Sequence, residues 1–277
     1  MDSLARLTET LPQLLAPWAL GFASMTAIEL LLPRERHSLR GRLPGLIFWS
    51  LWIPVMLLAH AAYRSLWAMI GIAPLNLAVL VPEMGPWANW TGAIVAPVLA
   101  AFIYDFFFYW FHRAQHRWLW RYHAVHHSIR ELNAVNAYHH ISEPLFQMLF
   151  LLVPASLIAV EASYSIPAVV VVLHLQASYI HSPARLDIGP LRALIVDNRF
   201  HRIHHSLDEH HFDKNFGACT TLWDRLFGTA WFPAKDEWPD VGLAGVEQPH
   251  SVRAWIDLPA RLKRRGNPAP DGLPDAI

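Results

Sequence analysis

The sequence predicts an all-α fold, in which a multi-pass membrane helical bundle carries a histidine-rich helical cap on its cytosolic side. Of the 277 residues, 54% are apolar and only 16% are charged, whereas a typical soluble domain has roughly 25% charged residues. The apolar residues gather in runs that approach the roughly 20 residues a helix needs to cross a bilayer. The chain also has 17 histidines, most of them at helical spacing in one region.

The expected membrane spans are residues 11–32, 46–62, 87–111, 144–160 and 163–180. The last two should form a hairpin, because only two residues separate them. Residues 65–81 are also apolar, but Arg64, Pro74 and Asn76 disfavour a full crossing, so an interfacial or re-entrant piece is expected there.

Arginine and lysine in the short loops predict how these spans are oriented, because cytosolic loops carry an excess of both. Basic groups follow the first, third and fifth spans, and another lies near the C-terminus. All of them can face the cytosol if residues 65–81 do not cross, and the N-terminus then faces the opposite side.

Charge and cysteine content exclude several classes of function. Lys+Arg and Asp+Glu balance at 22 each, so no basic surplus indicates a nucleic-acid partner. Cys219 is the only cysteine, which excludes an internal disulfide framework, a multi-cysteine zinc site and a cysteine-ligated iron–sulfur cluster. The sequence has neither a Gly-x-Ser-x-Gly elbow nor a Gly-x-Gly-x-x-Gly dinucleotide fingerprint.

Three groups of histidines have the spacing of a helical face. His112 and His116 are an i, i+4 pair that continues the third span, so both rings lie on one side of the helix. Two further groups have the form His-x-x-His-His, which brings three imidazoles onto one stripe of a helix. These triplets are His123, His126 and His127, and His201, His204 and His205.

Single histidines are weaker candidates. His174 and His181 share a helical face seven residues apart, and His140 stands between the groups. The others have no second histidine at ligand spacing on a predicted helix, so we interpret them as core, interfacial or loop residues. They are His37, His60, His139, His210, His211 and His250.

Eight clustered imidazoles are more than one metal ion needs. Neutral imidazole binds zinc, copper, iron and nickel, and a mononuclear site uses three or four ligands. The clusters therefore predict two metal ions in a nitrogen-rich site. A carboxylate di-iron bundle needs Glu-x-x-His pairs on facing helices, and the one such string, residues 247–250, lies in the C-terminal tail. The His-Glu-x-x-His motif of zinc peptidases is absent.

Over about residues 102–232 the chain resembles the fatty acid hydroxylase/sterol desaturase superfamily of integral-membrane enzymes. Residues 105–116, 123–128 and 201–206 are similar to its histidine boxes, and 213–217 and 222–229 to its closing motifs. The resemblance implies metal ligands at His112, His116, His123, His126, His127, His140, His181, His201, His204 and His205. This chain has Ile141 where many members have proline, and Ala177 where some have a further histidine.

The resemblance implies a lipid hydroxylase or desaturase in which two iron ions deliver two electrons to O2 and so attack an unactivated C–H bond. The implied substrate is a membrane lipid such as a sterol or a fatty acyl chain. Asp105, Glu143, Asp197 and Asn198 are expected to accept hydrogen bonds from imidazole N–H groups. Because the sequence has no flavin, nicotinamide or haem-binding motif, an external electron donor is expected, either a cytochrome or a ferredoxin with its reductase.

The expected organisation has three parts: N-terminal membrane helices over residues 1–91, a fatty acid hydroxylase-like catalytic domain over 92–232, and a loose cytosolic tail over 233–277. The active site should face the cytosol from a bacterial inner membrane or the endoplasmic reticulum. The alternative is a histidine-rich membrane protein that binds or transports metal without redox catalysis. Spaced groups at one membrane face favour the enzyme, since transporter histidines usually lie along a path inside spans or in a flexible loop.

Overall fold

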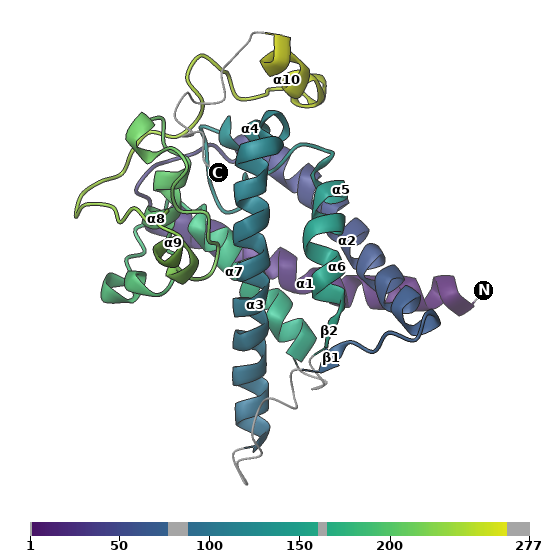
Figure 1. The fold of residues 1–277 in the computed structure, drawn as a ribbon. Helices are drawn as coiled ribbons and strands as arrows, with labels where there is room; N and C mark the ends of the chain where they lie inside the picture. Colours follow the sequence, from purple (N-terminus) through teal and green to yellow (C-terminus); the bar gives the residue numbers. More distant parts are fainter. Residues whose placement is uncertain (1, 77–87, 160–164, 265–277) are drawn as a thin grey trace.

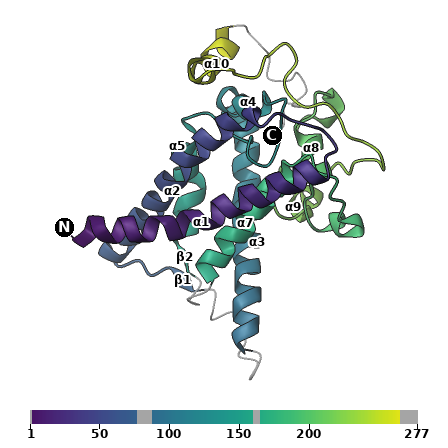
Figure 2. The same ribbon diagram turned by 180° about the vertical axis from the view of Figure 1, so that it is seen from behind.

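The computed structural model describes residues 2–76, 88–159 and 165–264, and within these ranges the fold is almost wholly helical (Figures 1 and 2). The long helices are α1 (Asp2–Leu31), α2 (Leu43–Met69) and α3 (Ala88–Trp118). Helix α7 (Ser165–Ile180) packs against both α1 and α3. The all-helical prediction is confirmed, apart from one short parallel pair between β1 (Leu75–Asn76) and β2 (Ile158–Ala159), with Leu75 opposite Ile158.

The apolar segments predicted to cross the membrane coincide with helices. Residues 11–32, 46–62 and 88–111 lie largely in α1, α2 and α3, and residues 165–180 form α7. Residues 144–159 run through α5 (Glu143–Gln147), a π-helical turn (Met148–Leu152), α6 (Val153–Ser156) and β2. Within the described ranges, the stretch Arg40–Met69 alone is long and apolar enough to cross a bilayer by length and composition.

The expectation of a separate piece at residues 65–81 is corrected in part. Residues 65–69 continue α2, which ends at Met69, because neither proline nor glycine occurs among them. Trp67 holds this end of α2 to α6, since its indole Nε1–H donates to the Ser156 hydroxyl at 2.7 Å. The chain then reaches β1, and residues 77–81 lie outside the described ranges.

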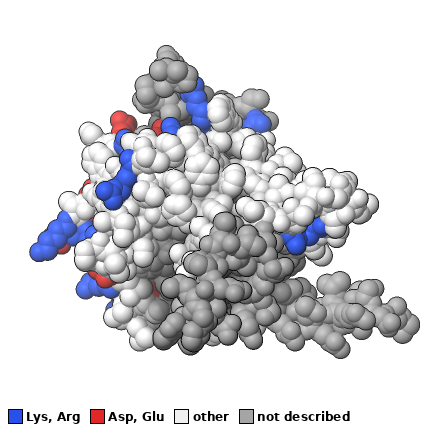
Figure 3. All heavy atoms as spheres, turned by 60° about the horizontal axis from the view of Figure 1, so that its bottom comes forward, with Lys and Arg blue, Asp and Glu red and all other residues white. Residues whose placement is uncertain are grey.

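The described part of one face of the molecule has few charged residues. Figure 3 turns the lower end of Figure 1 toward the viewer, and Lys, Arg, Asp and Glu there lie mainly at the edge of the described surface. Most of the exposed residues of α2 are apolar, such as Leu58, which is 62% exposed, and Met69, which is 83% exposed, while Arg64 is its one exposed charged residue. Such a surface is unusual for a soluble monomer.

Short helices gather around the C-terminal half of α3 (Figure 1). They are α4 (Trp120–His127), α8 (Asn198–His204), α9 (Leu222–Leu226) and α10 (Val252–Arg264). The helical turns Arg40–Arg42, Gly189–Ala193 and Glu209–His211 lie in the connecting segments.

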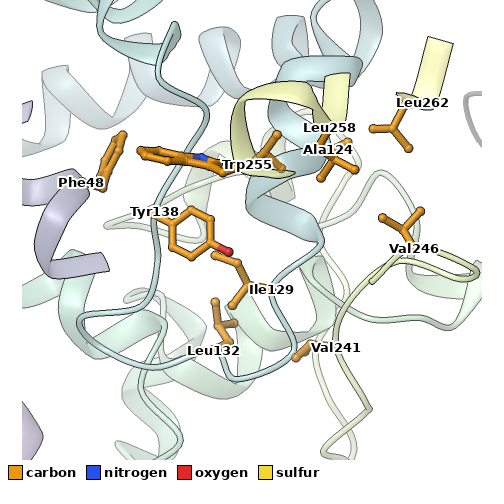
Figure 4. Packing of buried hydrophobic residues seen from close by; sticks show 11 residues of the cluster. Phe48, Ala124, Ile129, Leu132, Tyr138, Val241, Val246, Trp255, Leu258 and Leu262 are labelled. Carbon is orange, nitrogen blue, oxygen red and sulfur yellow. The ribbon is translucent and has the colours of Figure 1, made fainter. Parts of the chain in front are cut away.

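The prediction of a loose tail is wrong for residues 233–264. Helix α10 packs against α4 and buries Trp255, Leu258 and Leu262. These side chains join one apolar cluster with Phe48 of α2 and Tyr138 (Figure 4). The proline-rich composition concealed an amphipathic pattern, since these three apolar residues recur at i, i+3 and i+7. Residues 265–277 lie outside the described ranges.

Candidate metal centre

The structure brings the three histidine groups together where α3 ends. His112 and His116 lie in the last turns of α3, and the first triplet lies on α4. The helix breaks at Leu119, whose φ of −115° and ψ of 15° are not helical, so α4 folds back toward α3. The second triplet comes from α8 and its C-cap.

The assembled rings form two separate groups. In each group, every residue offers a nitrogen that lies within 4.8 Å of those of the others. We call His112, His116, His123, His127 and His204 the first histidine group. The second histidine group is His126, His181, His201 and His205. Each triplet contributes to both groups, so α4 and α8 connect them.

Nine of the ten sequence-predicted ligand positions therefore lie in these groups, and His140 does not. Its Nδ1 lies 2.8 Å from the Ser142 hydroxyl, and its Nε2–H donates to the Ile256 carbonyl at 3.3 Å. His174, a weaker candidate, lies against α1, where its Nε2–H donates to the Trp18 carbonyl at 3.1 Å.

The spacing between ring nitrogens fits metal coordination. In the first group, Nε2 of His112 lies 3.0 Å from Nε2 of His123, and Nε2 of His116 lies 3.2 Å from Nε2 of His127. Two nitrogens bound to one ion at about 2.0–2.1 Å are about 2.8–3.4 Å apart at angles between 90° and 109°. The second group has the same spacing, with Nε2 of His181 lying 3.0 Å from Nε2 of His201.

Hydrogen bonds to the outer ring nitrogens leave lone pairs directed into the second group. His126 donates its Nδ1–H to the Tyr138 carbonyl at 3.2 Å, and His181 donates its Nδ1–H to the Ala177 carbonyl at 2.7 Å. In a neutral imidazole the other ring nitrogen, here Nε2, then carries a lone pair and no proton. The two Nε2 lone pairs face each other at 3.3 Å, an arrangement that a bound metal ion would stabilise.

The loop of residues 213–217 supplies hydrogen-bond acceptors for the outer ring nitrogens of the first group. His112 donates its Nδ1–H to the Phe216 carbonyl at 2.8 Å, and His204 donates to the Lys214 carbonyl at 2.7 Å. The Asp213 carboxylate accepts from Nδ1 of His116 at 3.0 Å. Such outer partners fix the tautomer and the orientation of metal-binding imidazoles.

An unusual backbone gives this loop its shape. Asp213 and Asn215 have φ values of 56° and 60°, in the left-handed region that these residue types tolerate. Asn215 holds the turn by donating to the carbonyls of Phe200 and Trp231 and by accepting from the Trp231 N–H. These bonds leave the loop's carbonyls directed at the rings of the first group.

Burial keeps the imidazoles neutral and hence able to bind metal. The pKa of His181 falls to about 4 because burial disfavours the charged ring. For other members, burial and then the repulsion between neighbouring imidazolium charges hold the pKa well below 6.5. These members are His112, His123, His126, His127, His201, His204 and His205.

The four residues expected to accept from imidazoles bond elsewhere in the structure. The Asp105 carboxylate accepts the backbone N–H groups of Ala218, Cys219 and Thr220 at 2.8–2.9 Å, which attaches α3 to the segment that follows Phe216. Glu143 accepts from the Gln115 amide at 2.6 Å, and burial raises the pKa of its carboxyl to about 7.

The other two residues of that set position α8. Asp197 is its N-cap and accepts from the Phe200 N–H at 2.8 Å. The Asn198 amide donates to the carbonyls of Ser182 and Ala184 at 2.9 and 2.8 Å, which ties α8 to the segment after His181. In the described ranges no hydrogen bond joins these four side chains to an imidazole, although Glu143 Oε1 lies 3.9 Å from Nδ1 of His139. The predicted role as direct acceptors is thus corrected: these side chains hold the segments that carry the rings.

Sequence reasoning missed two contributors to the centre. Asp213 contacts His116 of the first group, and its place at the start of the closing motif 213–217 was the available signal. His139 stacks on His126 with ring centroids 4.1 Å apart and an interplanar angle of 16°. Its position beside His140 gave no indication of which of the two rings points inward.

Comparison with known proteins agrees with the geometry. Residues 97–229 match the family described as Fatty acid hydroxylase. Human alkylglycerol monooxygenase is 29% identical over 73% of this chain and 40% of its own length. Ornithine lipid hydroxylase OlsE of Rhizobium tropici is 31% identical over 53% of this chain and 45% of its own length. The rice very-long-chain aldehyde decarbonylase GL1-6 is 26% identical over 53% of this chain and 25% of its own length.

The chain therefore spans less than half the length of each of these relatives. No solved structure matches it.

Proposed function

Because the chain belongs to the fatty acid hydroxylase superfamily, we propose that it is a membrane-bound, O2-dependent oxidoreductase that hydroxylates or desaturates a lipid. The observation that carries this proposal is the pair of all-histidine groups, each with converging nitrogens. Such a donor set suits iron, copper, nickel or zinc. Zinc has no redox chemistry, whereas two of the relatives are named as a monooxygenase and a hydroxylase. Among the redox-active metals that remain, the similarity of the histidine boxes to those of the superfamily favours iron, so we propose that two iron ions occupy the two groups.

Bound there, two iron ions would supply the two electrons that activate O2 toward an unactivated C–H bond. The protein's own contribution is positioning and exclusion of water. The outward Nδ1–H bonds of His112, His126 and His181 fix the ring planes. Burial removes competing water and keeps protons off the nitrogens that would bind metal.

The substrate is a lipid with a long alkyl chain. The relatives are named for an alkylglycerol, an ornithine lipid and a very-long-chain aldehyde, and a substrate of lipid character is common to these names. Aromatic side chains lead from the apolar part of α3 to the first group, since the ring of Phe108 lies 5.2 Å from that of His112. An alkyl chain entering from the bilayer would meet these side chains first.

The enzyme is a multi-pass membrane protein with the centre on the cytosolic face. The candidate span Arg40–Met69 and the charge-poor face in Figure 3 support this arrangement. Electrons come from an external donor, a cytochrome or ferredoxin with its reductase, because turnover needs two electrons per O2 and the sequence carries no redox motif of its own.

Lipid mass spectrometry of cells that express the chain tests the proposal. The matched control is the variant His181→Ala, which removes one ring of the second group. The wild type should produce a lipid that has gained one oxygen or lost two hydrogens, only in the presence of O2, and the variant should not. A wild type that changes no lipid and binds zinc instead of iron would contradict the proposal.

A further inference from the structure

Helix α10 lies directly behind the helix that carries the first triplet. Trp255, Leu258 and Leu262 pack in one cluster with Ala124 and Val125 of α4 (Figure 4). These two α4 residues stand between His123 and His126 in the sequence, on the side away from the rings. Helix α10 therefore supports α4 from the face opposite the metal centre, although it lies beyond residues 97–229, which match the family.

Trp255 also contacts the segment 138–140, which passes between α10 and the centre. Its indole Nε1–H donates to the His139 carbonyl at 2.9 Å. Its ring packs edge-on against Tyr138, with centroids 5.8 Å apart, and against Phe48 of α2 at 6.1 Å. The neighbouring Ile256 carbonyl accepts from His140 at 3.3 Å. Two adjacent residues of α10 thus hold two adjacent residues of this segment.

The segment 138–140 in turn orients a ring of the second group. The Tyr138 carbonyl accepts from Nδ1 of His126 at 3.2 Å, and the His139 ring stacks on the His126 ring. Two of the groups that define the plane of His126 therefore belong to residues that α10 holds. A shift of this segment would turn His126 away from the other nitrogens of its group.

The chain leading to α10 reaches the second group from the other side. The Gly242 N–H donates to the His205 carbonyl at 3.3 Å, and the Leu207 N–H donates to the Asp240 carbonyl at 3.0 Å. The Arg202 guanidinium donates to the Pro239 carbonyl at 2.7 Å. One continuous stretch, residues 239–256, thus contacts both α8 and the segment that holds His126.

We propose that α10 is part of the metal centre's support and that Trp255 is a positioning residue for His126 in the second histidine group. The inference rests on the proposed function, because it presumes that both groups bind iron. It predicts a selective effect: loss of the Trp255 hydrogen bond weakens iron in the second group more than in the first, because the His139 ring lies nearer to that of His126 (4.1 Å between centroids) than to that of His123 (5.8 Å).

The release of Fe2+ to a colorimetric chelator tests this with the full-length protein loaded with two equivalents of Fe2+. The variants His181→Ala and His204→Ala identify which phase of release belongs to which group, since each removes a ring from one group alone. Trp255→Phe keeps the aromatic bulk and removes the indole donor. Trp67→Phe is the matched control, because it removes an indole hydrogen bond of 2.7 Å at the other end of α2.

We expect Trp255→Phe to accelerate the second-group phase about tenfold or more, in the range found when partners of ligating histidines are removed. The rate of the first-group phase should change much less, and Trp67→Phe should change neither phase. Equal rates in Trp255→Phe and the wild type, or equal acceleration of both phases, would overturn the inference. A wild type that retains no iron would instead overturn the proposed function.

Hydrogen exchange of the wild type provides a measurement that needs no variant. Coupling between two sites is reciprocal, so a helix that stabilises the iron site is itself stabilised when iron binds. Removal of iron should accelerate amide exchange in the peptide that covers residues 252–264. Unchanged exchange there, with faster exchange in α4 alone, would show that α10 is not coupled to the centre.

Discussion

At the scale of single residues, the centre depends on the groups that accept from the outer ring nitrogens. Most of these acceptors are backbone carbonyls, which a substitution cannot remove. Asp213 is the exception, because its carboxylate accepts from Nδ1 of His116 at 3.0 Å. A negative acceptor raises the basicity of the ring and thereby strengthens its bond to a metal.

Asp213→Asn should therefore weaken metal binding in the first group by about 10–100-fold. Asparagine tolerates the left-handed backbone at this position, so the loop should keep its shape. Titration of the metal-free protein with Fe2+ measures the effect, and Asp208→Asn, in the same loop region but bonded to His210, is the control. Equal affinities in the two variants would contradict this role of Asp213.

The buried imidazoles also predict how the stability of the metal-free protein depends on pH. Their pKa values are lower in the folded state than the usual 6.5, and that of His181 falls to about 4. Below pH 6.5 the unfolded chain therefore binds more protons than the folded protein does. Each such ring then lowers the free energy of unfolding by up to about 1.4 kcal/mol for every unit by which the pH falls.

The melting temperature of the metal-free protein should be level between pH 8 and pH 7 and should fall steeply between pH 6.5 and pH 5. Differential scanning fluorimetry across this range measures it. A melting temperature that stays constant down to pH 5 would mean that these rings are accessible to solvent.

At the scale of elements, α3 and the loop after Phe216 are held together by one carboxylate. Asp105 is fully buried and accepts three backbone N–H groups. Asp105→Ala should lower the free energy of unfolding by about 3 kcal/mol or more, because those buried donors lose their acceptor. Asp257→Ala, at an exposed pair with Arg253, should change it by about 0.5 kcal/mol or less. Denaturant titration in detergent compares the two, and similar losses would refute the role given to Asp105.

Local spacing predicted the ring-bearing elements because it is a property of neighbouring residues. The i, i+4 pair of His112 and His116 and both triplets needed only helical geometry to share a face. The acceptors for their outer nitrogens could not be predicted in this way, since Phe216 and Lys214 act through carbonyls that long-range folding directs. Trp255 illustrates a third case: its helical pattern was present in the sequence, but the residues it packs on are more than 100 positions away.

At the scale of the whole molecule, the charge-poor face and the site at the opposite end of α3 belong together. A face with few charged groups is stable in lipid, whereas the arginines beyond it remain in water. The protein should therefore stay with the membrane fraction after an alkaline carbonate wash and should dissolve only in detergent. Release by carbonate alone, measured by immunoblot, would contradict a membrane-spanning bundle.

Metal analysis of the purified protein tests the central claim most directly. The account predicts two iron ions per chain in the wild type and about one in each of the variants His181→Ala and His204→Ala, because each removes a ring from a different group. Zinc in place of iron, or a single ion that either substitution abolishes, would contradict the two-iron centre.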